Sequence, residues 1–160
     1  MATPTISAST RFFARGVSKC YFLPSVANKS APTRAEMNAG VDLSPQVADL
    51  NGFSVTGNTI DTPDLATTFD SKIAGTTSAE DSSIDLYASV DGVDVRTTLP
   101  RTTTGAIMFC DGGDVAGRKA DVFPIVVTSN TQMRSMSEAA KRQVSFAITS
   151  EPAEGVTIPA

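Results

Sequence analysis

Residues 83–90, SIDLYASV, alternate between polar and apolar side chains along most of their length. The even positions carry the apolar side chains of Ile84, Leu86, Ala88 and Val90. The odd positions carry Ser83, Asp85, Tyr87 and Ser89. A period of two is typical of a β-strand that packs one face on a core and turns the other face to a polar environment. This stretch therefore predicts a sheet with one apolar and one polar face.

Two more stretches show the same alternation. In residues 142–149 the apolar side is formed by Val144, Phe146 and Ile148, and the polar side by Gln143, Ser145 and Thr149. In residues 52–60 the apolar side is formed by Phe53 and Val55, and the polar side by Ser54, Thr56 and Asn58. We expect all three stretches to be strands whose polar faces carry mainly hydroxyl, amide and carboxylate groups.

Three further strands complete the expected sheets. Residues 17–23 end at Pro24, and residues 105–110 are apolar on both faces, which is typical of a central or covered strand. Residues 121–129 contain Pro124, which favours an edge strand or a bulge because proline cannot donate a backbone hydrogen bond. Between the last two strands, residues 111–114, DGGD, are typical of a hairpin connection.

Two short helices are expected between the strands. Thr33 and Glu36 have the spacing of a capping box, and Gly40 favours an end to the helix that they begin. Asp91 is the expected N-cap of a second helix over residues 92–99, which Pro100 would end. The predicted fold class is therefore α+β and mainly β.

Composition excludes several kinds of site. The 160 residues suit one domain, and the absence of His excludes Ser-His-Asp and Cys-His catalytic sets and histidine-bound metal. Cys20 and Cys110 cannot form a four-ligand zinc site, and each falls in an expected strand as a buried apolar side chain. We expect no enzyme activity, no cofactor and no metal. No apolar run approaches the roughly 20 residues of a membrane span, so we expect no membrane insertion.

Charge is unevenly distributed along the chain. Residues 1–40 carry a net charge of +4, residues 41–94 one of −9, and residues 95–160 one of +1. A basic and an acidic region on one chain favour head-to-tail attraction between copies. The expected organisation is an arm over residues 1–16, a β domain over residues 17–150 with a long polar connection at residues 59–82, and a tail over residues 151–160. A connection of that length is usually functional.

Taken in order, several stretches resemble the major tail tube proteins of long-tailed bacteriophages, of the siphovirus type and of actinobacterial hosts, in the superfamily that includes the type VI secretion tube. The stretches that carry this resemblance are residues 11–17, 21–24, 31–36, 61–64, 72–83, 111–117, 121–124 and 146–149. They are structural patterns, and their order over nearly the whole chain carries the resemblance.

The resemblance implies two packed antiparallel sheets with a flanking short helix. It implies hexameric rings in which each subunit contributes four strands to a continuous barrel, and it implies rings that stack into a hollow tube through long loops and terminal arms. Double-stranded DNA would pass through the lumen, and the partners would be other copies of the chain, a tape-measure protein and tail-tip or terminator proteins. The expected location is the virion tail, assembled in the cytoplasm of the bacterial host.

Two sets of residues follow from placing the sequence patterns in such a tube. The expected lumen wall is neutral or acidic, without Lys or Arg, and consists of Ser54, Thr56, Asn58, Ser83, Asp85, Tyr87, Ser89, Gln143, Ser145 and Thr149. Such a wall would release few counterions from DNA and would not hold the duplex. The expected contacts between subunits and rings are Arg11, Arg15, Asp61, Asp64, Asp70, Lys72, Glu80, Asp81, Arg101, Arg118 and Lys119.

Two other roles stay open at this point. A tail-completion or capsid decoration protein of related fold would form one ring or a trimer and would not polymerise. A monomeric binding module is less favoured, because Tyr87 is the single aromatic residue on an expected polar face and the chain has no Trp. The oligomeric state separates these roles.

Overall fold

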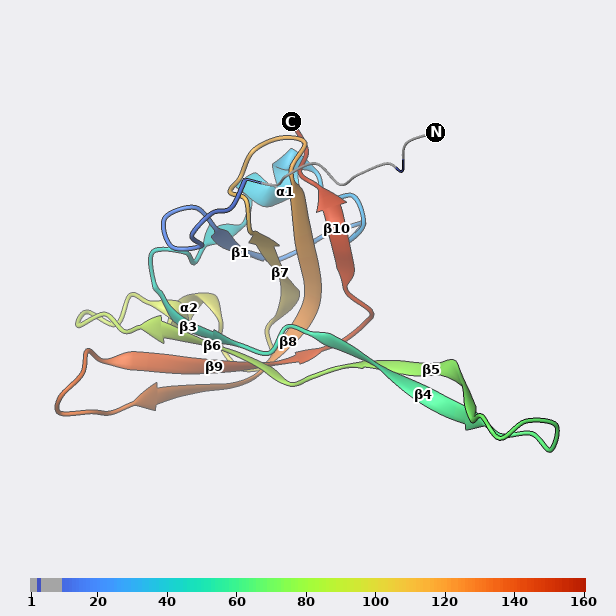
Figure 1. The fold of residues 1–160 in the computed structure, drawn as a ribbon. Helices are drawn as coiled ribbons and strands as arrows, with labels where there is room; N and C mark the ends of the chain where they lie inside the picture. The colour runs from blue at the N-terminus through green and yellow to red at the C-terminus, as the bar shows by residue number, and fades with distance from the viewer. Residues whose placement is uncertain (1–2, 4–9) are drawn as a thin grey trace.

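The computed structural model describes residue 3 and residues 10–160 (Figure 1). Its elements, in chain order, are β1 (Lys19–Leu23), α1 (Arg34–Asn38), β2 (Val41–Asp42), β3 (Val47–Asn51), β4 (Val55–Thr62), β5 (Ser71–Ala79), β6 (Ser82–Tyr87), α2 (Val95–Thr98), β7 (Thr104–Cys110), β8 (Lys119–Met133), β9 (Lys141–Ile148) and β10 (Ala153–Thr157). The strands form one eight-stranded and one two-stranded antiparallel sheet. The prediction of a mainly β fold with short helices is confirmed.

The long strand β8 connects the two halves of the larger sheet. The strand order is β2-β1-β7-β8-β9-β6-β3, and β10 also pairs with the first part of β8. Figure 1 shows β8 descending through the upper half and then turning into the lower half beside β9. The pairing with β9 shifts between Val127 and Ser129, as a β-bulge does, and a bulge bends a strand at that point.

The main core lies between these two halves. The upper half contributes Phe22, Ile107 and Phe123, and the lower half contributes Ile84, Val144 and Phe146, among others. The alternation of residues 83–90 and 142–149 therefore reflects burial of one face, as predicted, over Ser82–Tyr87 and Lys141–Ile148.

A second core lies on the other face of β1, β7 and β8. It includes Met108 and Val122 from the sheet, Met37 from α1, and Val156 and Ile158 from the C-terminal segment. Strand β7 is thus covered on both faces, as its sequence predicted. Residues 153–157, which fall in the segment expected as a tail, pair with β8 as the strand β10.

Pro124 does not lie on an edge strand, so of the two alternatives the edge was wrong, and the bulge of this strand lies further along, between Val127 and Ser129. Strand β8 is central, with Pro124 opposite Ala106 of β7. On its other side the partner changes from β10, which reaches Val122, to β9, which begins at Ile125. The proline therefore sits where the ladder passes from one strand to the next, and there its missing N–H leaves no ladder bond unmade.

The capping box that begins α1 is present as predicted. The Glu36 N–H donates to Thr33 Oγ1 at 3.2 Å, and the Thr33 N–H donates to Glu36 Oε2 at 2.7 Å. A hydrogen bond from the Ala27 N–H, as the largest cause, and the bonds from the Thr33 N–H and hydroxyl hold the pKa of the Glu36 carboxyl below its usual value. Gly40 follows the helix, and a Cβ there would lie 2.6 Å from Leu23 Cδ2. Glycine is required at this position by the close approach of the chain to β1.

The second helix is shorter than predicted, and Asp91 is not its N-cap. Asp94 caps α2 by accepting from the Arg96 N–H at 2.9 Å. Asp91 instead accepts from the Val93 N–H at 3.0 Å, which folds the preceding residues into a turn. The helix has only one turn because the residues expected to begin it, after Asp91, form a reverse turn instead.

The strand expected over residues 52–60 begins only at Val55, and residues 59–82 contain the second half of β4 and all of β5 where an irregular polar connection was expected. The chain leaves the larger sheet after β3 at Gly52 and Phe53, both of which have positive φ (81° and 57°). It then forms the two-stranded sheet of β4 and β5, which projects from the body (Figure 1). Since β3 pairs with β6 and β4 pairs with β5, residues 47–87 form one long hairpin with a kink in the middle.

Candidate assembly surfaces

Strands β3, β6, β9 and the second half of β8 share one polar face, which we call the polar wall. The register places Ser83 opposite Ser145, and Asp85 opposite Gln143, and residues that are paired in this way lie on the same face. Pairing extends the face to β3 and β8. The paired residues of the polar wall are Asp49, Asn51, Ser83, Asp85, Tyr87, Ser129, Thr131, Met133, Lys141, Gln143 and Ser145.

The structure brings together some of the expected wall residues and separates others. Ser83, Asp85, Tyr87, Gln143 and Ser145 lie on the polar wall, and Thr149 directly follows β9. The other expected residues lie elsewhere. Ser54 precedes the projecting hairpin, Thr56 and Asn58 lie in β4, and Ser89 lies beyond β6 in the segment that leads to α2.

The expectation of a wall without Lys or Arg was wrong for this face. Lys141 is paired with Tyr87 and Met133, so it belongs to the polar wall. Its Nζ lies 3.2 Å from Glu138 Oε2, and this contact raises the pKa of Lys141. With Asp49 and Asp85, the wall still carries more acidic than basic residues. Asp49, Asn51, Ser129, Thr131 and Lys141 were missed because register, rather than sequence alternation, places them there.

The polar wall ends in two open strand edges. In the described part of the chain, no strand pairs with the outer side of β3. On the opposite side, β7 pairs with β8 only as far as Val126, so among the described residues the rest of β8 has a strand partner only in β9. Exposed edges of this kind are templates for pairing with another chain.

The β4–β5 hairpin exposes apolar and acidic side chains together. Ile60 and Ile73 are cross-strand partners and are 52% and 54% exposed. The hairpin tip, residues 63–70, exposes Leu65 and Phe69. Isolated exposed apolar residues are normal, but several on one projecting element are typical of a contact surface.

The acidic residues of the hairpin differ in how they are compensated. Asp61 pairs with Lys72 at 2.9 Å, so the expected contact residue Lys72 is already engaged within the chain. Asp64 Oδ1 accepts from the Ala66 and Thr67 N–H groups at 2.7 and 3.0 Å and thereby shapes the turn. Asp70 is exposed just before β5.

The base of the hairpin is anchored in the main core by Phe53. Its ring lies 4.9 Å from Phe109 and 5.4 Å from Phe123, measured between centroids, with edge-to-face geometry. Its N–H donates to the Oγ of buried Ser82 at 2.8 Å. A Cβ at Gly52 would lie 2.8 Å from the Asp81 carbonyl oxygen. The kink is thus fixed by tight packing, which fixes the direction in which the hairpin projects. Glu80 and Asp81 lie at this base.

The bases expected to meet these acids are spread over the molecule. Arg11 and Arg15 are exposed before β1, and Arg101 is exposed in the turn after α2. Arg118 donates to the Gly112 carbonyl within the β7–β8 connection, and Lys119 Nζ donates to Thr157 Oγ1 at 2.8 Å. The structure therefore gathers no basic surface from the expected set. Of the expected arm, residues 1–2 and 4–9 lie outside the described residues.

Three other arginines do converge, in a hollow that the sequence reasoning missed. We call it the arginine pocket; its volume is about 390 Å³, and it is lined by Ala88, Ser89, Val90, Arg96, Gln132, Arg134, Ala140 and Arg142. These residues come from the segment after β6, from α2 and from the β8–β9 hairpin. No sequence spacing connects segments so far apart, so this site becomes visible only in the fold.

The described residues show no group of three or more His, Cys, Asp or Glu side chains that could hold a metal ion. None of the described helices is long and apolar enough to cross a membrane. Cys20 and Cys110 are buried free thiols, one in each core, as expected of apolar side chains. Burial raises the pKa of Cys20 to about 12 and that of Cys110 to about 11, which keeps both thiols protonated.

Comparison with known families identifies the class of protein. A family model described as "Phage tail tube protein" matches residues 7–160. The chain belongs to the phage tail tube protein family. A chain in the six-fold symmetrised anti-feeding prophage baseplate has the same fold, with a TM-score of 0.53, 9% identity and coverage of 94% of this tail tube protein and 95% of that chain.

A chain of the tube-terminating cap of the anti-feeding prophage is similar in fold as well. Its TM-score is 0.54 at 15% identity, with 92% of the tail tube protein and 95% of that chain covered. No curated protein matches the sequence. The tail tube protein is therefore a structural protein of the phage tail, which places it in the virion tail.

Proposed function

We propose that this tail tube protein forms hexameric rings that stack into the hollow tube through which phage DNA passes. The observation that carries the proposal is the polar wall, which consists of four antiparallel strands with an open edge on each side. Pairing of β3 in one subunit with the free part of β8 in the next would continue the sheet without interruption and cover both edges. Leu50 of β3, which is 44% exposed, would be covered by the same contact.

A ring of six such walls has the dimensions that DNA requires. Twenty-four strands spaced about 4.8 Å apart and tilted by roughly 40° close into a barrel about 48 Å in diameter. Side chains of about 5–6 Å on each side leave a channel wider than a DNA duplex. In this arrangement the polar wall faces the lumen, and the main core and α2 lie outside it.

The charge of the polar wall suits transport without adhesion. Binding to DNA is dominated by cationic groups that displace counterions from the phosphates. Asp49 and Asp85 outnumber Lys141, whose charge is also offset by Glu138. The wall therefore offers the duplex no net attraction.

We assign the β4–β5 hairpin to the contact between successive rings. Asp61, Asp64, Asp70 and Lys72 are its charged residues, and Glu80 and Asp81 lie at its base. Arg11, Arg15, Arg101, Arg118 and Lys119 remain proposed contacts between subunits. A tape-measure protein, tail-tip or terminator proteins, a siphovirus-type tail in actinobacterial phages and assembly in the host cytoplasm also remain proposals that rest on the sequence resemblance.

Electron microscopy of the purified protein at increasing concentration, with light scattering alongside, tests this function. We expect six-fold rings and hollow tubes, and we expect Leu50→Lys to prevent ring closure by placing a charge at the β3 edge. Val115→Lys is the matched control, because Val115 is 46% exposed on a loop away from both open edges. A monomer at every concentration, or a closed trimer, would contradict the proposal and favour the binding module or the completion protein.

A further inference from the structure

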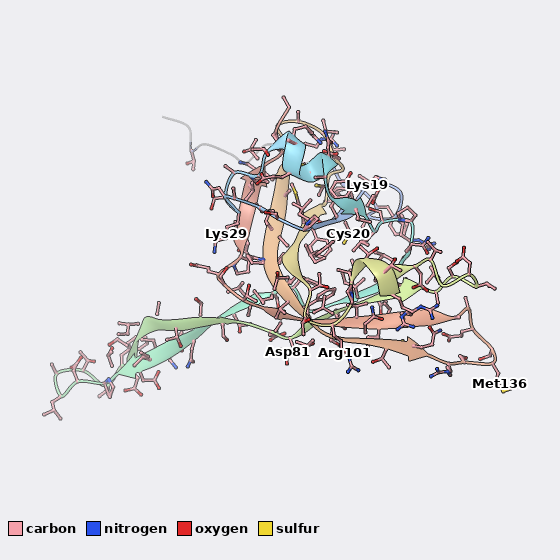
Figure 2. The ribbon with its side chains drawn as sticks, turned by 180° about the vertical axis from the view of Figure 1, so that it is seen from behind. Lys19, Cys20, Lys29, Asp81, Arg101 and Met136 are labelled. Atoms are coloured by element: carbon pink, nitrogen blue, oxygen red, sulfur yellow. The ribbon has the colours of Figure 1, made fainter. Side chains whose placement is uncertain are left out.

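The arginine pocket lies at the opposite end of the body from the β4–β5 hairpin. The pocket is formed in part by the β8–β9 hairpin, whose turn contains Met136. Figure 2 shows Met136 at one extremity of the molecule and the projecting β4–β5 hairpin at the other, and Figure 1 shows the connection from β8 to β9 on the opposite side of the body from that hairpin. When copies stack head to tail, these are the two ends that meet.

Two of the three arginines of the pocket have no ion-pair partner in the described part of the chain. Arg142 is only 9% exposed, yet its guanidinium donates to neutral acceptors: Asn130 Oδ1 at 2.7 Å, Gln132 Oε1 at 3.0 Å and the Asn130 carbonyl at 3.2 Å. Neither Arg142 nor Arg134 has a carboxylate within 4.0 Å in the described part of the chain, whereas Arg96 pairs with Asp94. A buried guanidinium normally requires a paired anion.

Apolar side chains are exposed in the pocket lining and in the segments that form it. Ala88, Val90 and Ala140 line the pocket, and Val90 is fully exposed. Met136 in the β8–β9 turn is also fully exposed, and Val93 before α2 is 75% exposed. The pocket thus combines two arginines that lack an ion-pair partner with apolar residues, which is typical of a protein contact surface rather than of a site for a free anion.

The tip of the β4–β5 hairpin has the complementary pattern. Leu65 is fully exposed and Phe69 is 77% exposed, and both lie between Asp64 and Asp70. Lys72 is engaged with Asp61, so the tip keeps a net negative charge. Phe53 holds the base of the hairpin in the core, so the tip is presented away from the body.

We propose that the hairpin tip of one copy docks in the arginine pocket of a copy in the next ring. Carboxylates of Asp64 and Asp70 meet Arg134 and Arg142, while the apolar side chains of the tip cover the apolar residues of the pocket. The two surfaces differ and lie at opposite ends, so the contact is heterologous and can repeat without limit, as an extending tube requires. This inference deepens the proposed function and rests on it.

Charge reversal on each side of the contact tests the docking. Arg134→Glu and Asp70→Lys each alter an exposed side chain, so circular dichroism should show an unchanged fold. We expect each variant alone to form rings and to shorten tubes at least tenfold by electron microscopy. An equal mixture of preformed rings should regain long tubes in which the two kinds of ring alternate, because one interface keeps the wild-type pair and the other brings the two reversed charges together, as in the double variant. The double variant R134E/D70K should regain long tubes.

Glu154→Lys is the matched control, because Glu154 is an exposed charged residue outside both the pocket and the hairpin, and reversal of its charge should leave tube length unchanged. If wild type and Arg134→Glu form tubes of the same length, the docking is overturned and the proposed function is left intact. Wild-type rings that never stack would overturn the docking together with the stacking that the proposed function includes. If Arg134→Glu forms tubes of wild-type length but no longer binds inorganic phosphate or duplex DNA that wild type binds, the pocket is a site for those anions. That result would also overturn the docking.

Absence of any wild-type ring would overturn the proposed function, and disulfide trapping would then decide the docking. A mixture of Leu65→Cys and Val90→Cys chains should form a mixed disulfide faster than a mixture of Leu65→Cys and Val115→Cys chains, because Val115 is exposed on a loop outside the pocket. Equal rates would overturn the docking. Buried Cys20 and Cys110 leave this readout undisturbed.

Discussion

The aromatic anchor at the base of the hairpin can be tested with two substitutions of the same residue. Phe53 combines a ring packed against Phe109 and Phe123 with a backbone in the left-handed region, at φ 57°. Phe53→Ala removes the ring and keeps the backbone strain. Phe53→Gly removes the same ring and relieves the strain. The pair of variants therefore separates packing from backbone conformation.

The magnitudes follow from the surroundings of the residue. Truncation of a core Phe to Ala costs about 3–5 kcal/mol, and the low end of that range applies because Phe53 is only partly buried. We expect Phe53→Ala to lower the free energy of unfolding by about 3 kcal/mol. The left-handed conformation costs a non-glycine residue about 1–2 kcal/mol, and the extra entropy of unfolded glycine offsets about half of this. Phe53→Gly should therefore be the less damaging variant, by about 0.5–1 kcal/mol.

Urea unfolding followed by far-UV circular dichroism measures both values. Phe69→Ala is the control: it removes a ring that is 77% exposed on the same hairpin, and it should change the free energy of unfolding by less than about 0.5 kcal/mol. A Phe53→Gly variant no more stable than Phe53→Ala would refute the argument from backbone strain. A Phe53→Ala variant within 1 kcal/mol of wild type would refute the argument from packing.

Three further predictions concern the wall, the first helix and the second. Asp85→Lys changes the balance of charge on the polar wall from acidic to basic, so tubes of this variant should retain duplex DNA at low ionic strength in a filter-binding assay, where wild-type tubes do not. Gly40→Ala places a Cβ 2.6 Å from Leu23 Cδ2 and should lower the free energy of unfolding by about 1–3 kcal/mol in urea titrations. A hydrogen bond from Arg96 lowers the pKa of Asp94 to about 2. The ionised Asp94 carboxylate therefore stabilises the fold fully above the ordinary carboxyl pKa, and this stabilisation is lost as the pH falls through about 2. The difference in free energy of unfolding between wild type and Asp94→Asn should accordingly be constant near neutral pH and should shrink to zero as the pH falls from about 4 to 2. Acid unfolding measures this difference.

Several features of the fold are encoded locally and could be predicted from sequence. The alternation in residues 83–90 arises from burial of one face against the core, and the apolar character of residues 105–110 arises from burial of both. The capping box of Thr33 and Glu36 involves only neighbouring residues. Each of these signals depends on contacts that the local chain geometry itself determines.

The features that failed depend on non-local geometry. The sequence pattern predicts Phe53 as an inward-facing strand residue, but its left-handed backbone conformation ends β3 and turns the chain into the β4–β5 hairpin. Lys141 joins the polar wall through its register with Tyr87, and Arg142 reaches the pocket from the other face of the same strand. A sequence shows the alternation of polar and apolar residues within one strand, whereas a wall or a pocket forms only when several strands pair.

Sequence alternation alone cannot distinguish a pore wall from an ordinary solvent-exposed face, and the open strand edges are the observation that supports the proposed pore wall. A wet face on a self-sufficient domain has protected edges, whereas this face ends in β3 and the free part of β8. The same reasoning explains how proposed weak contacts could build a long tube. One exposed ion pair contributes about 0–1 kcal/mol, so a single hairpin would hold a single subunit only briefly. A ring presents six hairpins at once, and six simultaneous contacts convert weak pairing into stable stacking. Ring closure through strand edges must then precede tube growth, and single subunits would not add to the end of a tube one at a time.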